Sequence, residues 1–145
     1  MKKTVSKRAD ETVALGREFA KLLKPGDVLG LKGDLGSGKT QFVKGICSYF
    51  EIDDDVNSPT FIIANQYEGT EPEASDKVKI NHLDLYRLKK ATEIDSLGMD
   101  NYFDSESITL IEWSELMEEY LGKELRTVSF EHGNEESDRI IYLPE

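Results

Sequence analysis

The 145-residue sequence has a single cysteine, Cys47, and only four prolines. One cysteine forms no internal disulfide and no thiolate zinc cluster, which favours a reducing compartment over secretion. We expect Cys47 to be a small core residue. A chain of this size buries roughly 68–70% of its unfolded surface on folding, and it is too short for a second domain of ordinary size. These limits predict one domain over residues 1–145.

Long apolar runs are also missing. The longest ones, such as 28–31 and 61–64, fall far short of the ~20 residues that cross a bilayer. No apolar segment of about 7–15 residues follows the basic residues near the N-terminus, so a secretory signal is not expected. The sequence therefore predicts a cytoplasmic protein with no membrane partner.

Basic residues are scarce relative to acidic ones. Lys and Arg number 18 against 29 Asp and Glu, which gives a formal net charge of −11. This balance repels phosphate backbones, so tight nonspecific nucleic-acid binding by the chain alone is not expected. Any role on a nucleic acid then needs a protein partner or a local basic patch.

Hydrophobic periodicity and turn residues predict alternating helices and strands. Helices are expected over 10–23, 40–50, part of 91–103, and 114–121. Strands are expected over 28–31, 60–67, 78–85, 108–111, 126–130 and 139–143. Segment 68–77 is expected to be a solvated loop or a hairpin connection, and Ser114 the N-cap of its helix. Early alternation and late strand pairing predict an α/β fold whose mixed sheet has antiparallel additions at one edge.

A glycine-rich segment, GDLGSGKT at 33–40, fits G-x-x-x-x-G-K-[ST] at every fixed position and lies between an expected strand and an expected helix. Glycines let backbone N–H groups approach phosphates closely, and the helix start adds partial positive charge. Lys39 is expected to reach the β- and γ-phosphates, and the Thr40 hydroxyl to hold Mg²⁺. The expected phosphate-binding residues are Gly33, Asp34, Leu35, Gly36, Ser37, Gly38, Lys39 and Thr40.

Two acidic residues compete to complete a magnesium site. Asp84 lies at the end of the expected strand 78–85, and Glu112 follows the apolar run 108–111. Mg²⁺ prefers oxygen ligands and keeps several waters, so either carboxylate suits the ion or its water shell. The residues alone leave open which acid contacts the metal.

Other residues near these motifs are less specific. Thr60 follows the glycine-rich loop by about 20 residues, where many nucleotide hydrolases keep a γ-phosphate sensor, although proline-turn chemistry explains it better. Trp113 suits stacking on a base or ribose, yet a lone tryptophan more often belongs to a core. His82 is expected to be a packed strand residue. An Asn-Lys-x-Asp segment for guanine is missing, and the D-x-x-G match at 95–98 lies in a helical stretch, so ATP is the expected nucleotide.

Four segments together resemble the TsaE (YjeE) family of small bacterial ATPases: the loop at 33–40, SPTF at 58–61, HLDLYRL at 82–88 and IEW at 111–113. The order and spacing of the last two blocks make the match specific. The resemblance implies an α/β P-loop NTPase with a mixed sheet flanked by helices. It also implies ATP binding and Mg²⁺-dependent hydrolysis in the formation of N6-threonylcarbamoyladenosine on tRNA beside the anticodon. In that family the protein acts on TsaD and its partner TsaB, meets tRNA only indirectly, and leaves the donor to TsaC.

The family pattern assigns roles to matching residues. Lys39 keeps the phosphate role and Thr40 the metal role, while Asp84 becomes the Walker B-like acid and Glu112 a second metal-site acid. The resemblance thus implies Lys39, Asp84 and Glu112 as catalytic residues. It implies Thr40, Asp84 and Glu112 as the metal site.

The same pattern extends the nucleotide-binding set. It adds Gln41, Thr60 in a switch-like position, and Trp113 close to the nucleotide, and it brings segment 11–12 near the base. Two departures are visible, because Ser114 stands where the family often has proline and Gln41 where a second threonine is common. Neither departure touches the essential chemistry.

Two other functions stay open on the residues alone. A small-molecule P-loop kinase would use Asp84 to deprotonate a hydroxyl acceptor, and a nucleotide-gated binding module would hydrolyse negligibly. The kinase usually needs an Arg-rich lid, whereas the long segment 68–77 is acidic and has no Arg. A fold shared by many chemistries does not decide between them.

Overall fold

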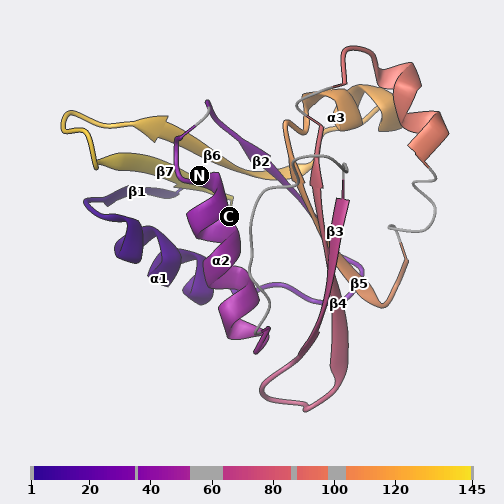
Figure 1. The fold of residues 1–145 in the computed structure, drawn as a ribbon, viewed down its shortest axis with the longest axis horizontal. Coiled ribbons are helices and arrows are strands. Elements are labelled where there is room, and N and C mark those ends of the chain that lie inside the picture. Colours follow the sequence, from indigo (N-terminus) through magenta and orange to yellow (C-terminus); the bar gives the residue numbers. More distant parts are fainter. Residues whose placement is uncertain (1, 35, 53–63, 86–87, 98–103, 145) are drawn as a thin grey trace.

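The computed structural model describes residues 2–34, 36–52, 64–85, 88–97 and 104–144 (Figure 1). Its centre is a seven-stranded sheet in the order β1-β7-β6-β2-β5-β4-β3. The strands are β1 (Lys2–Ser6), β2 (Val28–Lys32), β3 (Ala64–Thr70), β4 (Lys77–Asp84), β5 (Ser107–Glu112), β6 (Arg126–His132) and β7 (Arg139–Leu143). The helices are α1 (Ala9–Ala20), α2 (Lys39–Tyr49), α3 (Glu115–Leu121) and the 3₁₀ helix η1 (Ala91–Leu97).

The sheet mixes strand directions, as the sequence predicts. Four central strands, β6, β2, β5 and β4, run parallel to one another. At one edge β3 is antiparallel to β4, and at the other β7 is antiparallel to β6 and β1 to β7. The predicted antiparallel addition is confirmed at the edge formed by the late strands, but the other edge carries one too, which was not predicted.

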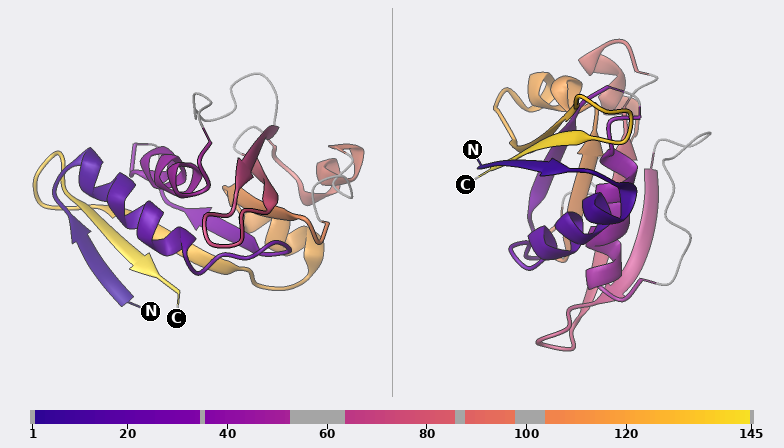
Figure 2. Two further views of the ribbon diagram at one scale, coloured as in Figure 1. Left: turned by 90° about the horizontal axis from the view of Figure 1, so that it is seen from below. Right: turned by 90° about the vertical axis from the view of Figure 1, so that its left-hand side faces the viewer.

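Helices cover both faces of the sheet (Figure 2). Side chains of α1 and α2 form one buried cluster with alternate sheet residues, including Leu29 and Leu31 of β2. On the other side, Ile94 of η1 and Met117 of α3 pack in a second cluster with Ile111 of β5. This division follows from the two-residue period of a strand, which sends neighbouring side chains to opposite faces.

The helix after the glycine-rich loop is held by a close contact between α1 and α2. A Cβ atom on Gly45 would lie 1.9 Å from the Val13 carbonyl oxygen, so only glycine permits this separation. Cys47 is buried in the same cluster, which confirms its expected place in the core. The position of α2, and with it the start of the loop-helix junction, thus depends on backbone-to-backbone packing.

Most expected elements are confirmed, with shifted ends. The first helix stops at Ala20 and not at 23, because 21–23 turn ahead of Pro25. Of the expected strand 60–67, residues 60–63 lie outside the described residues. The remainder belongs to β3, which continues through Thr70 into an antiparallel hairpin with β4, so the connection is shorter than the expected 68–77.

Ser114 occupies the expected N-cap position of α3, but its side chain does not cap the helix. Its backbone is helical (φ −72°, ψ −6°), and its side chain makes no capping hydrogen bond. A Cβ on Gly30 would lie 2.6 Å from the Ser114 Oγ, so the hydroxyl is packed against β2. Strand β1 was not expected either, because its mostly exposed KKTVS segment has no clear apolar alternation.

Across the part of the chain that the structure describes, no helix combines the length and apolarity that a membrane span needs.

Candidate nucleotide-binding site

The glycine-rich loop joins the end of β2 to the start of α2. Gly36 (φ +76°) and Gly38 (φ +107°) take left-handed conformations that favour glycine, and Gly38 is the N-cap residue of α2. The first N–H groups of a helix have no intrahelical partner. The junction therefore offers the backbone donors and partial positive charge that anion binding requires.

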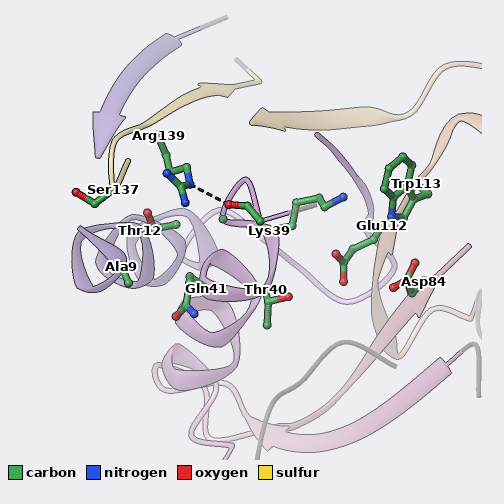
Figure 3. A pocket seen from close by; sticks show the side chains of 12 residues that line it. Ala9, Thr12, Lys39, Thr40, Gln41, Asp84, Glu112, Trp113, Ser137 and Arg139 are labelled. Atoms are coloured by element: carbon green, nitrogen blue, oxygen red, sulfur yellow. Dashed lines mark hydrogen bonds between the residues drawn. The ribbon is translucent and has the colours of Figure 1, made fainter. Parts of the chain in front are cut away.

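A cavity of ≈ 340 Å³ opens beside this junction (Figure 3). It is lined by Ala9, Thr12, Gly36, Gly38, Lys39, Thr40, Gln41, Asp84, Glu112, Trp113, Ser137 and Arg139. The figure shows two groups of side chains, with Thr40 and Gln41 between them. We call the group of Lys39, Asp84, Glu112 and Trp113 the strand end, and the group of Ala9, Thr12, Ser137 and Arg139 the hairpin end.

The two acids of the strand end are brought together by sheet register. Strands β4 and β5 are parallel and pair Asp84 with Glu112, while β2 places Leu31 beside Glu112. Both acids thus stand where parallel strands end, the usual place for ligand sites in such sheets. Glu112 is buried, whereas Asp84 is half-buried.

Lys39 lies between the loop and Trp113. Its Nζ donates a 2.5 Å hydrogen bond to the Gly33 carbonyl and lies 4.2 Å from the centroid of the Trp113 ring. Burial lowers the pKa of the Lys39 ammonium from its ordinary value, and the charges of Glu112 and Asp84 oppose that shift. The ammonium is therefore held in a partly desolvated position among acids.

Trp113 is held in an unusual backbone conformation. Its φ of +59° is rare for a bulky residue and marks local strain. The Trp113 N–H donates a 3.3 Å hydrogen bond to the Leu31 carbonyl of β2. The strained turn at the end of β5 thus places the indole over the loop lysine, and Trp113 belongs to the cavity wall.

His82 contacts one of the two acids. Its Nε2 lies 2.5 Å from the Glu112 Oε2, and both side chains are buried. The expectation of a packed strand residue is confirmed by its place in β4. Its contact with Glu112 was not foreseen, because it depends on the register between two strands.

The hairpin end was largely missed by the sequence analysis. Arg139 Nε donates a 3.1 Å hydrogen bond to the Gly36 carbonyl, drawn as the dashed line in Figure 3, although 103 positions separate the two residues. Ser137 precedes it in the turn between β6 and β7. Of the segment 11–12, Thr12 lines the cavity, while Glu11 accepts a hydrogen bond from the Lys7 N–H at 2.9 Å.

Three of the remaining expected nucleotide-binding residues, Gly33, Asp34 and Ser37, are not among the residues that line the cavity. Gly33 supplies the carbonyl that binds Lys39, and Asp34 is exposed. Ser37 is buried, and its Oγ has no hydrogen-bond partner among the described residues. Leu35 and Thr60 lie outside the described residues.

The metal-binding expectation rests on oxygen donors alone. Within the described ranges, no group of three or more His, Cys, Asp or Glu is arranged to hold a metal ion. Thr40, Asp84 and Glu112 nevertheless line one cavity. Such a sparse oxygen set fits Mg²⁺, which uses one or two carboxylates together with waters and phosphate oxygens.

Comparison with known proteins identifies the family. The family model described as threonylcarbamoyl adenosine biosynthesis protein TsaE matches residues 6–141. The chain belongs to the TsaE family. It is 38% identical over 134 residues to the tRNA threonylcarbamoyladenosine biosynthesis protein TsaE of Bacillus subtilis, covering 92% of this chain and 79% of that relative. Against the TsaE protein of Rickettsia bellii, identity is 39% over 119 residues, covering 81% and 78%.

A solved structure supports the same conclusion. The crystal structure of Bacillus subtilis YdiB aligns with a TM-score of 0.76 at 33% identity, over 97% of this chain and 82% of that chain. The family resemblance carried by the loop, the HLDLYRL block and the IEW block is therefore confirmed. The expected α/β fold with a mixed sheet is confirmed as well.

Proposed function

We propose that this TsaE protein binds and hydrolyses ATP in the cytoplasm during formation of N6-threonylcarbamoyladenosine on tRNA beside the anticodon. One observation carries the proposal: the glycine-rich loop, with Lys39 and Thr40, opens into the same cavity as Asp84 and Glu112. The names of the relatives support the pathway, since they are tRNA threonylcarbamoyladenosine biosynthesis proteins.

Nucleotide binding divides between the two ends of the cavity. The loop amides and the Lys39 ammonium suit the β- and γ-phosphates, because several donors and one positive charge are fixed at a helix start. The hairpin end suits the nucleoside, since Arg139 and Ser137 supply polar groups beside the α1 backbone. ATP is preferred over GTP because the sequence has no Asn-Lys-x-Asp segment.

The acids have separable tasks. Thr40 and Asp84, the more accessible pair, suit Mg²⁺ and its water shell, with Glu112 as a further ligand. When bound, the ion neutralises charge that develops on the phosphates. Glu112, buried and held by His82, also suits the acceptance of a proton from the attacking water.

We further propose that hydrolysis serves a protein assembly formed by TsaB and TsaD. A chain of net charge −11 is a poor solitary tRNA binder, whereas such a charge favours docking on a protein surface of complementary charge. Docking would complete a site that is slow alone, because phosphoryl transfer depends on positioned water and charge stabilisation. Contact with tRNA is then indirect.

Phosphate release from ATP and Mg²⁺ tests the function. The purified protein is assayed alone and with TsaB and TsaD, with Lys39→Ala as the blank. Release that the partners stimulate and the blank lacks supports the proposal. ATP binding without release in either condition overturns it in favour of a nucleotide-gated module, and phosphate transfer only to an added hydroxyl acceptor overturns it in favour of a kinase.

A further inference from the structure

We propose that His82 is a positioning residue for Glu112, whose carboxylate it fixes through an Nε2–H hydrogen bond. The inference rests on the proposed ATP hydrolysis and deepens it, because it names the group that orients a catalytic acid. His82 itself does not line the cavity. It acts through Glu112.

Sheet register explains how the two side chains meet. In the parallel pair β4–β5, His82 lies opposite Leu110 and Asp84 opposite Glu112. Side chains two residues apart on a strand share a face, so His82, Asp84 and Glu112 all stand on one face. Asp84 lies directly beside Glu112, at the carboxyl ends of the two strands. His82 is the diagonal neighbour of Glu112, two residues earlier on β4.

Burial makes this contact decisive for the carboxylate. The His82 side chain is 0% exposed and that of Glu112 only 4%. A buried carboxylate is stable only when hydrogen bonds or opposite charges replace its lost water. The 2.5 Å contact joins Glu112 Oε2 to the ring of His82, a residue that does not line the cavity. It therefore restricts the orientation in which Glu112 meets water or metal.

The second ring nitrogen indicates why a histidine stands here. His82 Nδ1 is buried and has no hydrogen-bond partner among the residues that the structure describes. A leucine would fill the position without burying an unpaired nitrogen. The hydrogen bond to Glu112 is thus the property that distinguishes histidine from an apolar residue at this place. An ionised carboxylate only accepts hydrogen bonds, so the proposed role requires the proton on Nε2.

The kinetic consequence follows from the geometric demands of catalysis. Misplacing a reacting group by about 1 Å can cost ~100-fold in rate. Loss of the His82 bond removes one constraint on the orientation of the Glu112 carboxylate and leaves the loop that binds phosphates unchanged. We therefore expect a selective loss of kcat.

Two substitutions and one control separate positioning from packing. His82→Leu keeps the volume but removes the donor, whereas His82→Gln keeps an N–H at a similar reach. His132→Gln changes the other histidine, which is exposed on β6, and serves as the control. We expect His82→Leu to lower kcat by roughly 10- to 100-fold, with KM and ATP affinity within about threefold. His82→Gln should restore most of the loss, and His132→Gln should match wild type.

A double substitution tests whether His82 acts through Glu112. In a Glu112→Gln background, His82→Leu should cause no further loss of kcat, because the group that it positions is gone. Additive losses would overturn the proposal. So would a folded His82→Leu protein that keeps its kcat while wild type hydrolyses ATP.

Nitrogen-15 NMR of the imidazoles tests the His82–Glu112 contact independently of ATP hydrolysis. The chain has two histidines, so His132→Gln assigns the His82 signals in the nucleotide-free protein. We expect a proton on His82 Nε2 that exchanges slowly with water and exchanges rapidly in Glu112→Ala. An Nε2 without a proton overturns the positioning role. If wild type releases no phosphate with or without its partners, the proposed hydrolysis fails, and the spectra still decide the His82–Glu112 bond.

Discussion

The two ends of the cavity are built on different principles. The strand end stands on parallel strands β2, β4 and β5, and its Lys39 and Glu112 are buried. The hairpin end comes from the β6–β7 turn and the start of α1, and its Ser137 and Ala9 are exposed, while its Thr12 is buried. Buried groups on neighbouring strands keep fixed geometry, whereas exposed groups on a turn adapt. The contrast predicts chemistry at the first end and adjustable binding at the second.

Loss of the loop lysine should have the largest effect. Lys39→Ala removes a buried ammonium that phosphates would contact, so ATP affinity should fall by ~100-fold or more, given the strength of charge-assisted hydrogen bonds. Calorimetric titration with ATP and Mg²⁺ measures the loss, and thermal unfolding checks the fold. Lys44→Ala, on the same helix but outside the cavity lining, is the matched control. Equal affinities for Lys39→Ala and wild type would remove the loop from the binding site.

Substitution of the two acids should separate catalysis from binding. Asp84→Asn and Glu112→Gln should each lower kcat by roughly 100-fold, in the range of lost acid–base or electrostatic groups. The variant that also needs more Mg²⁺ for half-maximal rate identifies the acid that contacts the ion directly. Steady-state phosphate release over a Mg²⁺ series measures both quantities. Glu119→Gln, on the exposed side of α3, should behave as wild type.

The sequence named more residues of the strand end than of the hairpin end, for a physical reason. Lys39 and Thr40 belong to one contiguous motif. Asp84 and Glu112 can be recognised because each carboxylate stands where an apolar strand ends. The bond between Arg139 and Gly36 joins residues 103 positions apart, and no local pattern encodes it.

Contacts that depend on the register between paired strands could not be predicted from the sequence either. Both strands of the His82–Glu112 contact were predicted, but the alignment of one against the other was not. Strand β1 pairs with β7 at an exposed edge, where backbone hydrogen bonds leave little imprint on side-chain pattern. Ser114 is the opposite case, in which a local signal was present but tertiary packing overrode it. Its residue type favours capping, yet its side chain packs against Gly30.

Substitution of Arg139 at the hairpin end should lower the affinity for ATP moderately. Arg139→Met removes the 3.1 Å bond to the Gly36 carbonyl, together with two bonds to the Glu136 and Asp138 carbonyls of the turn, while keeping much of the side-chain volume. A net hydrogen bond of about 1 kcal/mol corresponds to a rise of roughly fivefold in the KM for ATP. Arg139→Lys is the matched control, since it keeps the charge but loses the fork of donors. A fall in kcat as deep as that of Glu112→Gln would contradict the division between the two ends.

The smallest effect of a substitution is expected for the ion pair between Lys32 of β2 and Glu118 of α3. This pair lies on the face of the sheet opposite to α1 and α2. Lys32 Nζ lies 2.6 Å from one Glu118 carboxylate oxygen, and the other accepts the Leu125 N–H at 2.7 Å. Burial raises the pKa of Glu118, but the bonds from Lys32 and Leu125 outweigh it, so the pKa lies below its ordinary value. A lowered carboxyl pKa stabilises the fold above the unfolded-state pKa, and that stability disappears as pH falls through the folded-state value.

Glu118→Gln should therefore lower the free energy of unfolding by about 0.5–1 kcal/mol near neutral pH, a small value because the pair is partly exposed. The difference should vanish in acid, where wild-type Glu118 is protonated too. Urea denaturation at several pH values measures it, and Lys32→Met should match Glu118→Gln. ATP affinity should not change in either variant, because neither residue lines the cavity. A change of affinity would instead mean that the face behind β2 tunes the glycine-rich loop, and the strand end would no longer be a self-contained unit.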